Sequence, residues 1–175
     1  MAILARIAND VQLMFRRPPR QQYAALCYRV KKKTGELEML LLTSRDTGRW
    51  VIPKGWPMEG KLCHEAAARE AYEEAGVKGE AGAARIGTYL YDKGMRHGLK
   101  VQCMVQVYPL LVMDMLKDFP EKGSRKIEWV PFREGAGRVA EPMLRDLILD
   151  FERSLLGAPG AGASPSEISA RPAAG

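Results

Sequence analysis

The chain has few cysteines and lacks any long hydrophobic run. Its longest apolar stretches, such as residues 108–113, are far too short to cross a bilayer, which takes about 20 apolar residues. Cys27, Cys63 and Cys103 are widely spaced and odd in number, which argues against a disulfide framework and against a zinc site. We therefore expect a cytoplasmic protein with reduced thiols and no membrane span.

The remaining composition is that of a globular domain with an excess of positive charge. Of the 175 residues, 46% are hydrophobic and 27% charged, which suits one domain with a sizeable core. The net charge of +6 favours a small anionic ligand such as a phosphate compound, although nucleic acid is not excluded. Paired aromatic residues on adjacent strands, a feature of RNA-binding surfaces, are not evident. The sequence leaves the oligomeric state open between monomer and homodimer.

The two ends of the chain differ from its centre. Residues 1–20 combine apolar residues at helical spacing with a basic run, so we expect a basic amphipathic segment there. Its positive charge follows the apolar stretch, which is the reverse of a secretory signal. A transit peptide or a surface-seeking helix stays open, but a short helix packed on the domain or on a partner subunit is favoured. Residues 157–175 are rich in Gly, Ala, Pro and Ser and are expected to be disordered.

The central residues 21–156 predict a mixed α/β domain. Strands are expected at residues 22–30, 37–43, 50–52, 84–91, 99–112 and 126–131, and helices at 62–75 and 141–156. Basic turns at 31–35 and 92–98 join two pairs of strands. Ala67, Ala71 and Ala75 share one face of the first helix, where small side chains allow close packing on a sheet. The order of elements is not the regular βαβαβ of a dinucleotide-binding fold.

The same helix carries three acidic residues on one face. Glu70, Glu73 and Glu74 stand at positions i, i+3 and i+4. Like charges at this spacing destabilise an isolated helix by about 0.2–0.5 kcal/mol per pair, and Arg69 neutralises only part of them. Hard carboxylate oxygens suit a divalent cation such as Mg²⁺. The sequence therefore predicts a metal site.

The segment around these glutamates resembles the Nudix box. Residues 55–77 agree with the pattern G-x5-E-x7-R-E-U-x-E-E-x-G-U, where U is an apolar residue, at every fixed position except the first Glu, which is Lys61 here. This resemblance implies a Nudix-type α/β/α sandwich with a mixed central sheet. It also implies hydrolysis of a nucleoside diphosphate linked to another moiety, or of a related polyphosphate.

Shorter stretches resemble particular branches of that family. Residues 42–53, 72–79 and 125–129 are similar to diphosphoinositol polyphosphate phosphohydrolases, whose relatives also act on diadenosine polyphosphates, and residues 53–55 are similar to diadenosine tetraphosphate hydrolases. The resemblance favours a Mg²⁺-dependent pyrophosphohydrolase that cleaves a phosphoanhydride bond in an inositol pyrophosphate or a diadenosine polyphosphate. An RNA 5′ pyrophosphohydrolase and a non-catalytic nucleotide-sensing Nudix domain stay open as alternatives.

The resemblance also implies roles for residues of the box. Glu70, Glu73 and Glu74, helped by the backbone carbonyl of Gly55, are expected to hold Mg²⁺, with Mn²⁺ as a substitute. Metal ions neutralise the charge that builds on phosphoryl oxygens during in-line attack by water. Glu73 is our prediction for the general base. Arg69 is expected to orient a neighbouring glutamate through a charge-assisted hydrogen bond.

Basic and aromatic side chains are the candidates for substrate contacts. They are Arg45, Arg49, Lys54, Trp56, Arg96, Arg125 and Lys126. We expect Arg45, Arg96 and Arg125 to lie across a cleft from the glutamates. Trp56 either stacks on a base or packs on the sheet, and Trp129 is interpreted as core or pocket wall.

Lys61 is the one departure from the box pattern. It removes a negative charge and places a cation near the positive end of the helix dipole, at a cost of about 0.3–1 kcal/mol if the side chain is exposed. Reduced metal affinity is therefore expected, and this keeps the sensing alternative open.

Overall fold

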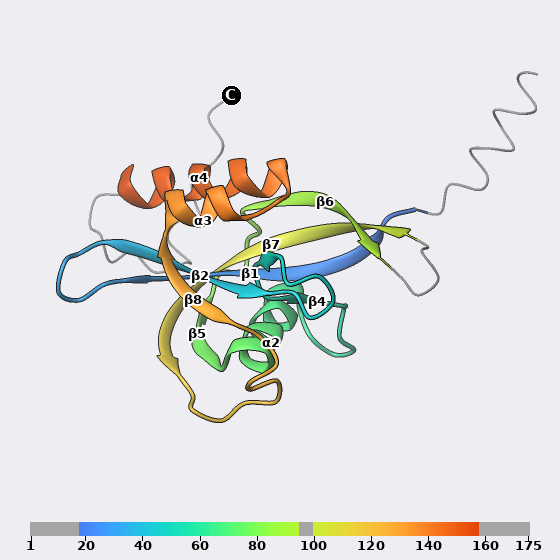
Figure 1. Ribbon diagram of the computed structural model, residues 1–175, viewed down its shortest axis with the longest axis horizontal. Coiled ribbons are helices and arrows are strands. Elements are labelled where there is room, and N and C mark those ends of the chain that lie inside the picture. The colour runs from blue at the N-terminus through green and yellow to red at the C-terminus, as the bar shows by residue number, and fades with distance from the viewer. Residues whose placement is uncertain (1–17, 95–99, 158–175) are drawn as a thin grey trace, which may run out of the picture.

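The computed structural model describes residues 18–94 and 100–157 of the chain. Within these ranges the strands are β1 (Arg20–Val30), β2 (Leu37–Thr43), β3 (Trp50–Val51), β4 (Lys54–Gly55), β5 (Val77–Ala81), β6 (Gly87–Gly94), β7 (Lys100–Met115) and β8 (Ile127–Pro131), and the helices are α2 (Cys63–Ala75), α3 (Phe132–Arg138) and α4 (Pro142–Gly157). Helices α3 and α4 cover one face of the sheet and α2 covers the other (Figure 1). The predicted α/β/α sandwich is confirmed.

Three parts of the sequence-based prediction lie outside the described residues. They are the N-terminal segment up to residue 17, the turn at 95–98 with Arg96, and the tail from residue 158 onward. In the ranges that are described, no helix is both long and apolar enough to cross a membrane.

The long strands β1 and β7 form the centre of the sheet. They pair in parallel, in a register that runs from Arg20 opposite Cys103 to Tyr28 opposite Leu111. All other pairings are antiparallel: β2 and β4 lie on the free edge of β1, β5 and β6 lie on the free edge of β7, and β3 and β8 pair with β2. The sheet is therefore mixed, as predicted, and β4 runs beside β1 at its middle.

Two hydrophobic layers lie on opposite faces of this sheet. The layer beneath α3 and α4 contains Tyr28 and Phe151, whose rings meet edge to face at 5.3 Å between centroids. The layer beneath α2 contains Ala67, Ala71 and Ala75, each 0% exposed, which confirms the predicted buried face. Because alanine side chains are short, the helix lies close to the sheet, and its acidic face comes near β4.

Three elements were not predicted from the sequence. Strand β4 has only two residues and directly follows Pro53, β5 is exposed over most of its length, and α3 contains two glycines that lower its helix propensity. The strand expected at 84–91 begins later and ends later, because pairing with β7 starts only at Gly87 opposite Val107. Strand β7 continues to Met115, beyond the expected residue 112, because its last residues pair with β5.

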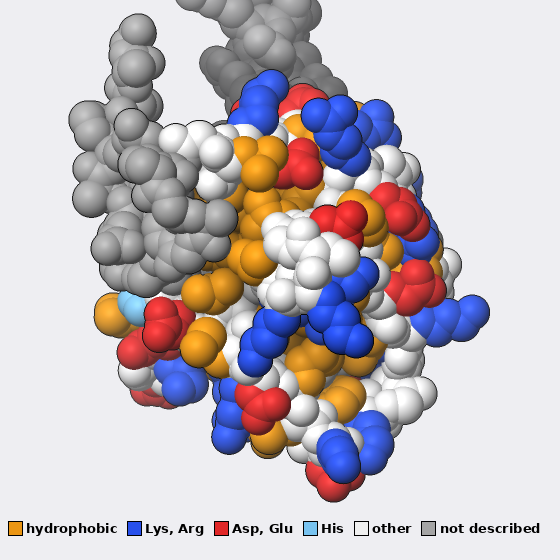
Figure 2. Space-filling model, turned by 90° about the vertical axis from the view of Figure 1, so that its left-hand side faces the viewer, with side chains coloured by type: hydrophobic (Ala, Val, Ile, Leu, Met, Phe, Trp, Pro, Cys, Tyr) orange, Lys and Arg blue, Asp and Glu red, His pale blue; other side chains and the backbone are white. Residues whose placement is uncertain are grey.

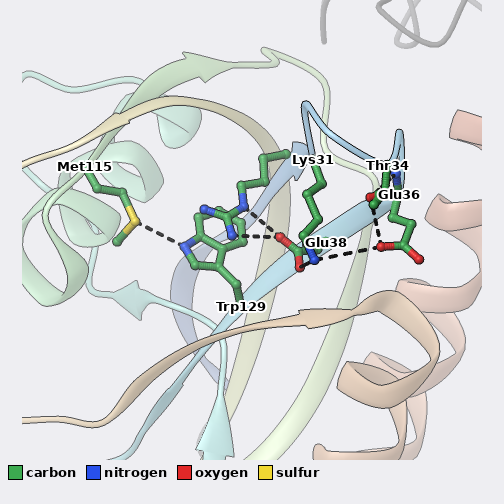
Figure 3. Close-up of polar contacts among 7 residues, drawn as sticks. Lys31, Thr34, Glu36, Glu38, Met115 and Trp129 are labelled. Atoms are coloured by element: carbon green, nitrogen blue, oxygen red, sulfur yellow. Dashed lines mark hydrogen bonds and ion pairs between the residues drawn. The ribbon is translucent and has the colours of Figure 1, made fainter.

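Trp129 on β8 lies in a cluster of polar contacts at one end of the sheet (Figure 3). Its indole N–H donates to the Met115 sulfur at 3.2 Å, and the Arg29 guanidinium carbon lies 4.0 Å from the ring centroid. Arg29 also donates two hydrogen bonds, of 2.7 and 2.9 Å, to the Glu38 carboxylate. Trp129 therefore packs against the protein itself.

Candidate active site

The acidic face of α2 meets the end of β4 at Gly55. A Cβ atom built on Gly55 would lie 1.9 Å from Oε1 of Glu70. The Glu70 carboxylate therefore fills the space that any side chain at position 55 would need. Glycine at this position brings the carboxylate directly against the backbone of β4.

The Glu70 carboxylate has no hydrogen-bond or ion-pair partner among the described residues. Burial raises its pKa to about 7, and the negative charges of Glu74 and Glu73 add to the rise. A partly buried carboxylate without a protein partner is an acceptor for a cation or a proton.

The Glu74 carboxylate is buried and is held on both oxygens. The backbone N–H of Lys54 donates to Oε2 at 3.2 Å, and the Arg125 guanidinium donates to Oε1. Burial raises the pKa of Glu74, while the positive charges of Arg125 and Lys54 oppose the rise. Glu74 is therefore held by protein donors on both of its carboxylate oxygens.

Glu73 is more exposed than its two neighbours and pairs within its own helix. Arg69 Nε donates to Glu73 Oε1 at 2.5 Å, one turn apart. This is the kind of contact that the sequence predicted for Arg69. The role of Glu73 as general base stays a prediction.

The loop between β7 and β8 brings a fourth acidic residue, Glu121, to this network. Its backbone N–H donates to the carbonyl of Glu73 at 3.0 Å, and its carboxylate pairs with Arg125 at 3.0 Å and with Arg45 at 3.3 Å. Sequence reasoning missed Glu121. Its spacing of four residues from Arg125 was the available signal.

The candidate substrate residues are distributed unevenly around the glutamates. Arg125 is buried and bonded to protein acceptors, whereas Arg45 is exposed and contacts the same Glu121. Arg49 pairs with Glu141 at 3.6 Å, just before α4. Lys126 is exposed, and its backbone bonds to Thr43. Arg96 lies outside the described residues. Arg45 and Arg125 share the partner Glu121, and Arg125 also bonds directly to Glu74, so the arrangement across a cleft stays a prediction.

Lys54 and Trp56, on either side of Gly55, lie among further cations. The Lys54 ammonium lies 5.4 Å from the Tyr91 ring centroid, and burial lowers the pKa of this lysine. The Arg20 guanidinium carbon and the Lys93 ammonium lie 4.7 and 5.1 Å from the Trp56 ring centroid. Tyr91 and Arg20 were not expected here, since neither belongs to a motif.

Residues 20–148 match the family model described as the NUDIX domain, which covers most of the chain. The chain belongs to the Nudix family. It is a hydrolase that acts on phosphoanhydride bonds.

Curated Nudix relatives and solved structures agree with this assignment. The chain is 30% identical over 154 residues to "Nudix hydrolase 21, chloroplastic" of Arabidopsis thaliana, covering 86% of this chain and 75% of the relative. It is 35% identical over 113 residues to human "Diphosphoinositol polyphosphate phosphohydrolase 3-beta", which is 63% of each protein. The fold resembles that of a C. elegans Ap4A hydrolase, with a TM-score of 0.57 and 21% identity over 79% of this chain and 99% of the other.

Nudix enzymes typically use a divalent metal, and the donor set on α2 fits one. Carboxylate oxygens are the hard ligands that Mg²⁺ and Mn²⁺ take, and the Glu70 carboxylate, set against Gly55, has no protein partner in the described ranges. Over those ranges, however, no three His, Cys, Asp or Glu side chains converge as a finished metal site. Arginines engage two of the glutamates: Arg69 pairs with Glu73, and Arg125 pairs with Glu74.

Lys61 lies in the exposed loop just before the Nudix helix. Its backbone N–H donates to the Met58 carbonyl at 3.2 Å, and no side-chain contact to the three glutamates is seen. The helix starts without a Ser or Thr cap, but Glu65 accepts a 2.9 Å hydrogen bond from the Leu62 N–H. Glu65 thus places negative charge in the first turn, which offsets the cation at Lys61.

Proposed function

We propose that this Nudix hydrolase is a Mg²⁺-dependent pyrophosphohydrolase acting on a highly phosphorylated anion, with an inositol pyrophosphate favoured. The observation that carries the proposal is the set of glutamates on α2, with the Glu70 carboxylate against Gly55 at the end of β4. This juxtaposition sets one hard oxygen ligand, the Glu70 carboxylate, against β4, on the helix face that also carries Glu73 and Glu74, in a chain that matches the Nudix model.

The residues of α2 have different roles in the proposed reaction. The Mg²⁺ ion would be held by Glu70, Glu73 and Glu74 together with the carbonyl of Gly55. Mn²⁺ could take its place. When bound, the cation neutralises charge on the phosphoryl oxygens and positions the phosphoanhydride. Glu73 accepts the proton of the attacking water, and Arg69 holds Glu73 in orientation through its 2.5 Å hydrogen bond.

The cations around Gly55 support a substrate rich in phosphate. Arg20 and Lys93 lie over the Trp56 ring, and the Lys54 ammonium lies nearby over Tyr91. Two cations over one indole leave less of its surface for stacking on a base. This favours an inositol pyrophosphate, which has no base, over a diadenosine polyphosphate. Arg45, Arg49 and Lys126 stay secondary candidates for phosphate contacts.

A diadenosine polyphosphate is the second candidate. Its support is the short likeness of residues 53–55 to diadenosine tetraphosphate hydrolases. An RNA 5′ end is less favoured, because the sequence shows no paired aromatic residues on adjacent strands. The face in Figure 2 carries basic and acidic side chains interspersed around hydrophobic ones, so this face is not a continuous basic surface.

We propose that the protein works in the cytoplasm. In the described ranges Cys27, Cys63 and Cys103 are all free, which suits a reducing compartment. The word chloroplastic in the name of the Arabidopsis relative describes that protein and is not carried over to this chain.

The test is a hydrolysis panel with Mg²⁺, and with EDTA as a blank. The panel compares a diphosphoinositol polyphosphate, diadenosine tetraphosphate, ADP-ribose, a nucleoside triphosphate and triphosphorylated RNA. We expect the highest kcat/KM for the inositol pyrophosphate, and a loss of about 100-fold or more in kcat for Glu73→Gln. Glu65→Gln is the matched control, because it makes the same change on the same helix and glutamine still accepts the Leu62 hydrogen bond.

Three results would count against the proposal. Turnover of none of these compounds by the wild type would favour the non-catalytic sensing domain. A clear preference for RNA or for the dinucleotide would replace the substrate. Equal loss of activity in Glu73→Gln and Glu65→Gln would remove the specific role of Glu73.

A further inference from the structure

All three guanidinium nitrogens of Arg125 donate hydrogen bonds to protein acceptors. Nε donates to Glu121 Oε2 at 3.0 Å, Nη1 donates to the Thr43 carbonyl at 3.0 Å, and Nη2 donates to Glu74 Oε1. Its side chain is only 7% exposed. In this arrangement Arg125 is a buried bridge between β2, the β7–β8 loop and the Nudix helix.

Both oxygens of the Glu74 carboxylate accept hydrogen bonds from the protein, and the side chain is 8% exposed. Oε1 faces Arg125, and Oε2 faces the backbone N–H of Lys54 at 3.2 Å. A guanidinium is thus already bonded where the proposed function requires a divalent cation. The two cations repel each other, and in a buried site this repulsion is poorly screened.

Glu70 and Glu73 do not have this conflict. Glu70 has no partner among the described residues, and the pairing of Glu73 with Arg69 is on the more exposed side, at 32% and 47% side-chain exposure. An exposed pair within one helix contributes little free energy, so it opposes an added metal ligand less than a buried pair does. Of the three glutamates, Glu74 is the one whose protein contact opposes metal binding most strongly.

We propose that Arg125 is a positioning residue that holds Glu74 in the metal-free protein and releases it when a divalent cation binds. Nε and Nη1 keep their bonds to Glu121 and Thr43, so the side chain stays in place and only Nη2 is freed. A freed N–H donor beside the glutamates is suited to a phosphate oxygen. The proposal rests on the proposed function, since it takes Glu74 as a metal ligand.

Release of Arg125 predicts that removing the guanidinium strengthens metal binding. We would measure Mn²⁺ binding at pH 8.5 without substrate, from the EPR signal of free Mn²⁺. In Arg125→Gln the guanidinium no longer competes with the metal for the Glu74 carboxylate. This variant should therefore bind Mn²⁺ about tenfold more tightly than the wild type. Arg125→Lys, a point charge with no planar fork, should fall between the two.

Arg45→Gln is the matched control. It removes the same charge from an exposed partner of the same Glu121, but Arg45 does not touch Glu74. Its Mn²⁺ affinity should change by about twofold or less, because an exposed ion pair contributes little. Circular dichroism and thermal melts establish that each variant is folded.

A second measurement needs no variant of uncertain stability. In wild-type protein with ¹⁵N-labelled arginine, rotation about the Cζ–Nη2 bond of Arg125 is slow while Glu74 holds it. Saturating Mg²⁺ should accelerate this rotation. Arg138, which pairs with Glu128 and Glu134, is the internal reference and should not respond.

Two results would overturn the inference. One is weaker or unchanged Mn²⁺ binding in Arg125→Gln, which would mean that Arg125 only shapes the site. The other is a Cζ–Nη2 rotation of Arg125 that stays slow at saturating Mg²⁺. A protein that shows the predicted tightening but hydrolyses nothing would keep the inference and refute the proposed function, whereas absence of Mn²⁺ binding in all forms would refute both.

Discussion

The close approach of Gly55 to Glu70 makes Gly55→Ala the sharpest test of the site. Ordinary van der Waals contact begins at 3.4 Å, whereas the new methyl group would lie 1.9 Å from Glu70 Oε1. The carboxylate therefore has to retreat by about 1.5 Å. A displacement of about 1 Å in a catalytic constellation can cost about 100-fold in rate, so we expect kcat/KM to fall by about that factor.

The same substitution should leave the fold nearly unchanged. Gly55 is not among the glycines with a left-handed backbone, so alanine adopts its conformation without strain. The gain from a less flexible unfolded chain, about 0.4–1 kcal/mol, offsets the cost of moving a flexible carboxylate. We expect the free energy of unfolding, measured in urea, to stay within about 1 kcal/mol of the wild type.

Gly137→Ala is the control for this test. A Cβ on Gly137, in α3, would meet no atom within 4 Å. This variant should keep full activity and gain up to about 1 kcal/mol of stability, because alanine favours a helix over glycine. Wild-type kcat/KM and wild-type Mn²⁺ affinity in Gly55→Ala would refute the reasoning, since the position of the Glu70 carboxylate would then not matter.

Two further predictions concern the scaffold. Burial by itself would raise the pKa of Glu38, but the hydrogen bond and charge of Arg29 outweigh it, so the folded pKa lies below the unfolded one. The stability that this pair contributes is present above the unfolded pKa and is lost as pH falls through the folded pKa. Below about pH 4.5 the free energy of unfolding, measured in urea, should therefore fall more steeply in the wild type than in Glu38→Gln. Parallel pH curves for the two proteins would contradict this. Cys27 and Cys103 are 0% exposed, and burial raises the pKa of both thiols. A thiol reagent should therefore label only the half-buried Cys63 in the native protein. Fast labelling of all three cysteines would contradict the packing.

The sequence predicted the Nudix helix and its immediate surroundings well, because the signals there are local. The buried alanine face follows from helical spacing, and Gly76 ends the helix in a left-handed conformation with φ of 68°. The clustering of Glu70, Glu73 and Glu74 follows from the same periodicity. The contact between Arg69 and Glu73 needed only the one-turn spacing.

The contacts between segments that are distant in sequence could not be predicted from the sequence. Glu121 reaches the site because the β7–β8 loop folds back onto the end of α2, where its N–H bonds to the Glu73 carbonyl. Arg20 on β1 and Lys93 on β6 are 73 positions apart in sequence, and they meet at Trp56 because β7 pairs with both of their strands. No local pattern encodes such distances. The same holds for Arg125, whose sequence context indicated a phosphate ligand but whose guanidinium is bonded within the protein.

These long-range contacts change which residue is expected to limit metal binding. From sequence, Lys61 is the anomaly, because it replaces a box glutamate. In the structure Lys61 is exposed, its side chain has no contact with the three glutamates, and Glu65 offsets its charge. A screened surface cation shifts affinity little, whereas the buried guanidinium of Arg125 is bonded directly to a predicted metal ligand. We therefore expect Lys61→Glu to improve Mn²⁺ binding less than Arg125→Gln does, and the reverse order would return Lys61 to the centre of the explanation.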